Sequence, residues 1–198
     1  MACAYRVASR RAEIGQPEIN LHVIPGFGGT QMLPRLAVRK ALSGRGEVYA
    51  LLVGALAMLL DGRRRSAADA LALGLVDEVA PADALSHALG VARRVADGTF
   101  DGQLWSPLAL PSPTLAFPNV ERDGEIQRLL AHHERVPRAA CARAIVEAVR
   151  AGFTDGLETG LLLEAREFGR LVASDDGHAG IDRFFARQSL PLPSRRQG

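Results

Sequence analysis

The sequence predicts an α/β fold, on the evidence of three features. Short extended segments come first, at residues 3–8 and 14–21, and a third lies at residues 75–79. Amphipathic helical patterns separate and follow these segments, with glycine or proline at their ends. The length of 198 residues, 47% of them apolar, suits one domain with a buried core of alanine, leucine and valine.

The two N-terminal segments are predicted to be strands. In the first, Tyr5 and Val7 alternate with smaller or polar residues, the pattern of a half-buried strand. In the second, Pro17 removes a backbone donor and favours an extended conformation for Gln16, so this strand lies at an edge or is bent. Glu18 is then a single carboxylate on an otherwise apolar strand, and partial burial there raises the pKa of a carboxyl group.

A glycine-rich turn follows at residues 24–29, with the sequence Ile-Pro-Gly-Phe-Gly-Gly. Three glycines in four positions allow positive φ and a close approach of the backbone to a ligand. Thr30 can open a helix that runs to about Arg39. The free amides at its start are predicted to point toward Glu18 and a bound anion or oxyanion.

Helical patterns dominate the rest of the chain. The longest uncharged apolar run, residues 48–60, is shorter than the ~20 residues that span a bilayer, and it predicts a buried helix and no membrane span. Residues 98–123 contain four prolines among apolar residues and predict an ordered connection packed over the core. The other predicted helices are 66–73, 81–96, 124–152 (interrupted near Pro137), 156–173 and 177–187, followed by a loose tail at 189–198.

Charge and cysteine content argue against nucleic acids, anionic membranes and metal ions as ligands of this protein. The net charge is +2, from 24 basic and 22 acidic residues, which disfavours nucleic acid and anionic membranes as partners. Cys3 and Cys141 have no CxxC partner and no histidine at ligand spacing, so we expect two buried thiols in a reducing compartment and no metal site. Arginines interrupt any apolar run near the N-terminus, which predicts no signal peptide and a cytoplasmic location.

Three blocks of sequence, in order, resemble the enoyl-CoA hydratase/isomerase (crotonase) family. The first runs from Gly15-Gln-Pro-Glu-Ile-Asn-Leu through Ile24-Pro-Gly-Phe-Gly-Gly-Thr-Gln to Leu33-Pro-Arg-Leu. The second is Asp61-Gly-Arg with Ser66-Ala-Ala-Asp-Ala-Leu-Ala-Leu-Gly-Leu-Val-Asp-Glu-Val, and the third lies within residues 151–187. Residues 100–190 look most similar to the hydratase half of bifunctional fatty-acid oxidation enzymes.

The resemblance implies a spiral core of ββα units and C-terminal helices that trimerise, giving a homotrimer or hexamer. On that basis residues 1–97 are a partial spiral core, 98–123 the connection, 124–188 the C-terminal helical region and 189–198 the tail. It also implies acyl-CoA thioester substrates, with coenzyme A as part of the substrate and no other cofactor. The chemistry is hydration of a 2-enoyl-CoA, or a shift of its double bond, through an enolate that two backbone N–H groups hold.

The family's functional positions can be carried over to four residues. Glu18 matches the second catalytic glutamate, the general acid/base, and Gly26 matches the glycine whose amide lies near the reacting water or substrate. Pro25 and Phe27 are expected to help wall the pocket. Arg63-Arg64-Arg65 either contacts the phosphates of coenzyme A or, as the sequence favours, forms a solvated loop. Glu158 and Glu164 are six residues apart and do not share a helix face, so they are not paired catalytically.

The chain also departs from the family pattern. The first catalytic glutamate and both oxyanion amides precede the segment that matches Met1, so we expect the N-terminal part of the core to be missing and activity to be impaired. An isomerase, which can rely on the glutamate matching Glu18, is less affected than a hydratase. The alternative is a non-catalytic truncated paralogue that assembles with a full-length relative. RNA binding, known for some relatives, is disfavoured by the balanced charge.

Overall fold

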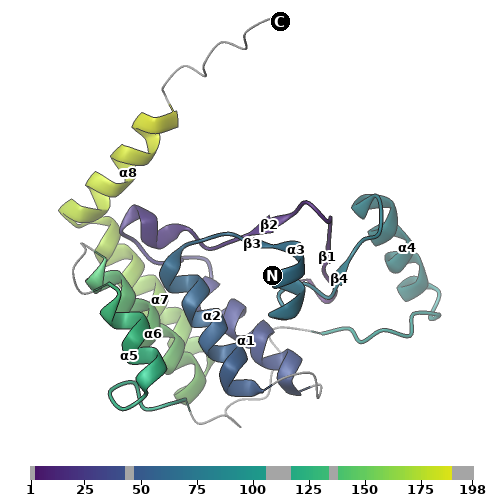
Figure 1. Ribbon diagram of the computed structural model, residues 1–198, viewed down its shortest axis with the longest axis horizontal. Helices are drawn as coiled ribbons and strands as arrows, with labels where there is room; N and C mark the ends of the chain where they lie inside the picture. Colours follow the sequence, from purple (N-terminus) through teal and green to yellow (C-terminus); the bar gives the residue numbers. More distant parts are fainter. Residues whose placement is uncertain (1–2, 43–46, 106–116, 134–137, 189–198) are drawn as a thin grey trace, which may run out of the picture.

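The computed structural model describes residues 3–42, 47–105, 117–133 and 138–188. Helices make up most of this part of the chain (Figure 1). They are the 3-10 helix η1 (Glu18–Leu21), α1 (Gly29–Leu42), α2 (Val48–Asp61), α3 (Ala67–Ala72), α4 (Ala84–Ala96), α5 (Gly124–Ala131), α6 (Ala139–Thr154), α7 (Leu157–Val172) and α8 (Asp175–Gln188). The strands are β1 (Val7–Ala8), β2 (Glu13–Ile14), β3 (Arg65–Ser66) and β4 (Glu78–Val79).

The strands form two short pairs that join distant parts of the chain. β1 pairs in parallel with β4, with Val7 opposite Glu78. β2 pairs antiparallel with β3, with Glu13 opposite Ser66. The predicted extended segments at residues 3–8 and 75–79 are therefore confirmed, and each is two residues long as a strand.

One hydrophobic core lies among α1, α2, α6 and α7, with residues from Ala8 to Leu171 in the same cluster. The apolar run at 48–60 is the buried helix that was predicted, and its side chains from Leu52 to Leu60 supply much of this core. Helices α6 and α7 approach each other closely at Gly152 and Gly160, because a Cβ on Gly160 would lie 2.6 Å from the Cα of Gly152. Both glycines also lie against the buried side chain of Gln31.

The predicted strand at residues 14–21 is wrong beyond Ile14. Glu18 begins η1 instead of lying on a strand. Pro17 precedes η1 with φ −84° and ψ 4°, a conformation that starts a helical turn, and its missing N–H costs nothing there. η1 ends at Leu21, and His22 follows it in the left-handed conformation with φ 59°.

The structure describes only part of the predicted proline-rich connection at residues 98–123. The described ends of the proline-rich connection pack on the core, because the ring of Trp105 lies beneath the guanidinium of Arg39 and Phe117 packs against Phe153. Residues 106–116, Pro137 and the tail at 189–198 lie outside the described residues. The division into four segments stays a prediction.

The two cysteines differ, contrary to the expectation of two buried thiols. Cys141 is buried, and burial raises the pKa of its thiol to about 11. Cys3, which precedes β1, is exposed. Within the described ranges, no helix is long and apolar enough to cross a membrane, and no cluster of three potential metal ligands occurs.

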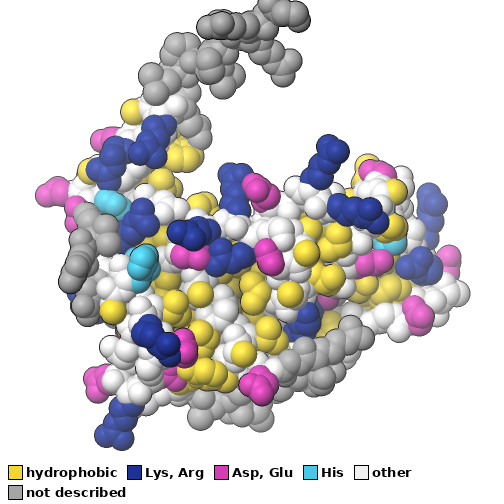
Figure 2. All heavy atoms as spheres, in the orientation of Figure 1, with side chains coloured by type: hydrophobic (Ala, Val, Ile, Leu, Met, Phe, Trp, Pro, Cys, Tyr) yellow, Lys and Arg dark blue, Asp and Glu magenta, His cyan; other side chains and the backbone are white. Residues whose placement is uncertain are grey.

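Helices α4 and α8 project from opposite ends of the molecule (Figure 1). α8 exposes Phe184 and Phe185, and α4 exposes Leu85 and Leu89. Figure 2 shows further apolar side chains, in yellow, across the middle of the face that the two figures view. The described part of the chain thus presents apolar surface at both ends.

Candidate functional site

Glu18 is partly buried at the first position of η1. Neighbouring residues fix η1 from two sides: Ile19 is fully buried, and the Nδ2 of Asn20 donates to the carbonyl of Gly62 at the end of α2 over 3.1 Å. From α8, Gly180 lies directly against the Leu21 carbonyl. The carboxyl group of Glu18 therefore rests on a fixed backbone.

The pKa of Glu18 is raised above the ordinary glutamic acid value. Burial is the main cause, and the negative charge of Glu164 adds to it. A hydrogen bond from the backbone of Glu18 itself acts in the opposite direction. The group therefore keeps its proton to higher pH than an exposed glutamic acid does, as partial burial predicts.

Gln16 connects Glu18 to the glycine-rich turn. With its amide nitrogen facing Glu18, Gln16 donates to the two carboxyl oxygens over 3.0 and 3.1 Å. The same amide lies against Gly29, where a Cβ would be 3.1 Å from the end of the Gln16 amide and 2.6 Å from the Cβ of Pro25. Only glycine leaves room for this arrangement. The sequence reasoning passed over Gln16 as a functional side chain, although its place two residues before Glu18 was visible.

The turn itself is closely packed except at its tip. A Cβ on Gly26 would lie 2.8 Å from ring carbons of Phe168 on α7, so the ring covers this glycine. Gly28 has φ +80°, which glycine adopts without strain. Phe27 points away from the molecule and its side chain is fully exposed. The roles expected for Pro25, Gly26 and Phe27 at a substrate pocket stay predictions.

The start of α1 faces Glu164 and not Glu18, which corrects the expectation from the sequence. The amide of Gly28 donates to Glu164 Oε1 over 2.6 Å, and the amide of Thr30 to Oε2 over 2.9 Å. The Thr30 hydroxyl donates to the same Oε2 over 2.5 Å. Glu164 is 2% exposed, so a buried carboxylate caps α1 from a residue 136 positions away in the sequence.

The spacing of residues along α7 could have identified Glu164 as a buried side chain. Gly160, Glu164, Phe168 and Leu171 follow one another at intervals of four, four and three residues, so they share one face of the helix. Three of these four residues are buried, and Phe168 is packed against Gly26. The sequence reasoning compared Glu164 only with Glu158, which is exposed.

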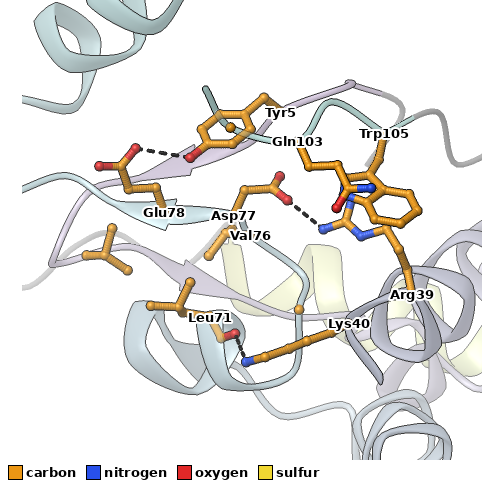
Figure 3. A pocket seen from close by; sticks show the side chains of 12 residues that line it. Tyr5, Arg39, Lys40, Leu71, Val76, Asp77, Glu78, Gln103 and Trp105 are labelled. Carbon is orange, nitrogen blue, oxygen red and sulfur yellow. Dashed lines mark hydrogen bonds and ion pairs between the residues drawn. The ribbon is translucent and has the colours of Figure 1, made fainter. Parts of the chain in front are cut away.

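One cavity adjoins Gln16, and a larger one lies at the far end of α1. The smaller one, of about 210 Å³, is lined by Gln16, by Arg6 and by apolar side chains that include Ile14, Leu33 and Met58. The larger one, of about 720 Å³, lies between β4 and the end of α1 (Figure 3). Its polar groups bind one another: Asp77 pairs with Arg39 over 2.5 Å, Tyr5 donates to Glu78, and Lys40 donates to the Leu71 carbonyl. This pairing favours a structural role for the larger cavity's lining.

The arginine loop has partners on the protein. Arg65 pairs with Asp61 over 2.6 Å, and Arg64 with Glu13 over 3.3 Å. These contacts fit the solvated loop that the sequence favours, although Arg65 lies in β3. The alternative, a contact of Arg63-Arg64-Arg65 with coenzyme A phosphates, is not tested by these contacts.

We expect Glu18→Gln to stabilise the fold at neutral pH. Because folding raises the pKa of Glu18, its protonated form stabilises the protein below the unfolded pKa, and that contribution is lost as pH rises through the folded pKa. The free energy of unfolding of the variant should therefore match that of the wild type in acid and exceed it at neutral pH. Urea denaturation across this pH range measures the difference, and Glu13→Gln is the exposed control. A difference that does not grow with pH would contradict the expectation.

Comparison with known proteins gives matches over nearly all of the chain. The model of a family described as enoyl-CoA hydratase/isomerase matches residues 1–101, just over half of the sequence. The human peroxisomal bifunctional enzyme is 31% identical over 188 residues, which are 95% of this chain and 24% of that protein. A peroxisomal fatty acid beta-oxidation multifunctional protein of Arabidopsis thaliana is 33% identical over 96% of this chain and 24% of its own length.

Solved structures share the fold. A carnitinyl-CoA dehydratase from Mycobacterium thermoresistibile aligns with a TM-score of 0.53 at 21% identity, covering 91% of this chain and 54% of that one. An enoyl-CoA hydratase from Rhodobacter sphaeroides aligns with a TM-score of 0.54 at 19% identity, covering 93% and 54%. The expected α/β fold class is thus confirmed, and the chain spans about half the length of these structures and about a quarter of the curated relatives.

Proposed function

We propose, because this chain belongs to the enoyl-CoA hydratase/isomerase family, that it acts on acyl-CoA thioesters with Glu18 as the general acid/base. The observation that carries the proposal is the environment of Glu18. This carboxyl group is partly buried, its pKa is raised, and Gln16 holds both of its oxygens. A pKa moved toward neutrality suits a group that both donates and accepts a proton during turnover.

Two reactions fit such a group. In hydration, the oxygen of a water adds to the β-carbon of a 2-enoyl-CoA as a hydroxyl, Glu18 delivers a proton to the α-carbon, and the proton that the water loses returns to the Glu18 carboxylate. In a double-bond shift, Glu18 removes a proton from one of the α- and γ-carbons and returns it to the other. Each reaction leaves the thioester intact and needs no cofactor besides the coenzyme A of the substrate. The apolar cavity of about 210 Å³ beside Gln16 is suited to a short apolar group.

The test is turnover of crotonyl-CoA, and of a 3-enoyl-CoA for the double-bond shift, by the purified chain. Glu18→Gln keeps the size of the side chain and one acceptor oxygen for Gln16 but removes the transferable proton. We expect it to lower turnover by about 10²- to 10⁴-fold, the usual contribution of a general acid/base. Glu13→Gln, at an exposed residue in β2, should leave turnover unchanged. Equal activity of the wild type and Glu18→Gln would contradict the proposal.

A second candidate function is assembly, as a non-catalytic subunit, with a full-length relative. The exposed Phe184 and Phe185 on α8, and Leu85 and Leu89 on α4, favour it because solvent-exposed apolar side chains often mark an interface. A homotrimer or hexamer of the chain itself is proposed on the same ground.

Light scattering would give the mass of the assembly in solution. A chain that is inert alone but co-purifies with a full-length family enzyme would favour assembly over catalysis. The cytoplasmic location stays a prediction, since the human and Arabidopsis relatives are both named as peroxisomal.

A further inference from the structure

Glu164 is a buried carboxylate that has no role in the reaction proposed above. Its side chain is 2% exposed in the middle of α7, where an apolar residue would bury at no electrostatic cost. Taking a carboxylate out of water costs several kcal/mol unless hydrogen bonds replace the lost hydration. Here three donors do so, and all three belong to the stretch Gly28–Thr30.

We propose that Glu164 is a positioning residue of the Glu18 site: it holds the turn at residues 26–30 in place and sets a second negative charge beside Glu18. This inference rests on the proposed function of Glu18. It concerns a residue in the C-terminal helical region, far in sequence from the motif that contains Glu18.

The first part of the argument is geometric. Each oxygen of Glu164 binds a different amide of the turn, Gly28 through Oε1 and Thr30 through Oε2, so the carboxylate fixes the direction in which α1 begins. Four residues further along α7, the ring of Phe168 covers Gly26. One face of α7 therefore contacts both ends of the turn. Gly29, between the two bound amides, faces Gln16, which binds Glu18.

The second part is electrostatic. Glu164 is the charged group that raises the pKa of Glu18 in addition to burial. The charged side chains of α2 and α8, which pack against η1, contact groups other than Glu18. Asp61 at the end of α2 pairs with Arg65, and Arg183 of α8 lies 3.4 Å from the Nδ1 of His22. The backbone carbonyl of Asp176, and not its carboxylate, faces the same ring nitrogen over 3.1 Å. The interaction between the two glutamates is therefore the one that a single substitution can remove.

The experiment is a titration of Glu18 by NMR in the full chain labelled with 13C-glutamate, with Glu18→Gln to assign the resonance. In Glu164→Gln, which keeps the shape and removes the charge, the midpoint of Glu18 should move to lower pH. In Glu158→Gln, the same change at an exposed position of α7, it should stay at the wild-type value. An unchanged midpoint in Glu164→Gln would overturn the proposal.

Amide hydrogen exchange tests the geometric part and covers a variant that fails to fold. Glu164→Asp keeps the charge but is one methylene shorter, so it cannot reach both Gly28 and Thr30. We expect faster exchange of these two amides than in the wild type, with the Glu18 midpoint kept. Wild-type protection of both amides in Glu164→Asp would overturn the positioning role.

Turnover separates this inference from the proposed function. In Glu164→Gln, kcat should fall roughly ten- to a hundredfold through displacement of the turn, and the pH–rate limb that belongs to Glu18 should move to lower pH. A loss of turnover in Glu18→Gln together with a wild-type pH–rate profile in Glu164→Gln would overturn the inference and leave the proposed function standing. Conversely, a chain without turnover in which Glu164→Gln still moves the Glu18 midpoint would contradict the proposed function and not the coupling.

Discussion

Asp77→Asn should lower the free energy of unfolding by about 3–5 kcal/mol, the usual cost of removing one partner from a buried ion pair. The Asp77 carboxylate lies between two arginines, with Oδ2 2.8 Å from Arg6 Nη2 and Oδ1 2.5 Å from Arg39 Nη2. All three side chains are at most 9% exposed. The backbone amide of Arg6 also donates to Oδ2 over 2.8 Å, so the same carboxylate joins β1 to the segment that enters β4.

The reason for the size of the effect is that the two guanidinium groups stay charged. Burial lowers the pKa of Arg39 and the nearby Arg6 lowers it further, but arginine remains protonated at neutral pH. Without the carboxylate, the two positive charges face each other at low exposure. Urea denaturation measures the loss. Glu13→Gln removes the exposed partner of Arg64 and should cost less than about 1 kcal/mol. Equal effects of the two substitutions would contradict this account.

Gly160→Ala should lower the free energy of unfolding by about 3 kcal/mol, at the upper end of the cost of overpacking a core. The added methyl group would lie 2.6 Å from the Cα of Gly152 and closer still to the buried amide of Gln31. The Gly152 backbone cannot move freely, because its carbonyl accepts from Arg35 Nη2 over 2.6 Å. Gln31 is held in turn by the Ala148 carbonyl over 2.7 Å. Relief of the clash therefore requires α6 and α7 to separate.

Gly169→Ala is the matched control in the same helix. A Cβ at Gly169 meets no atom within 4 Å, and alanine favours the helix by up to about 1 kcal/mol over glycine. The two substitutions should thus shift the urea midpoint in opposite directions. A stabilised Gly160→Ala variant would show that the close approach of α6 and α7 is absent in solution.

Local signals in the sequence were sufficient for the family, the order of the helices and the catalytic candidate. The run at 48–60 is apolar on nearly every face, and only a buried helix accommodates it. The predicted helix at residues 66–73 is α3, and Ser66 caps it, with the Asp69 amide donating to Ser66 Oγ over 3.1 Å. The conformation at Glu18 was mistaken because the effect of Pro17 on Gln16 was extended to the residues after it, whereas a proline also fits the start of a helical turn.

By itself, the sequence determined that Glu18 lies next to a proline and shortly before a glycine-rich turn, because both signals are local and depend on residue types a few positions apart. Only the tertiary structure decided what faces the start of α1. A helix start attracts any nearby carboxylate, and the sequence offers Glu18 ten residues before Gly28 and Glu164 far beyond it. The packing of α7 brings Glu164 to these amides, and the carboxyl group of Glu18 accepts hydrogen bonds from Gln16 instead. The choice depends on how helices pack, and no local pattern contains that information.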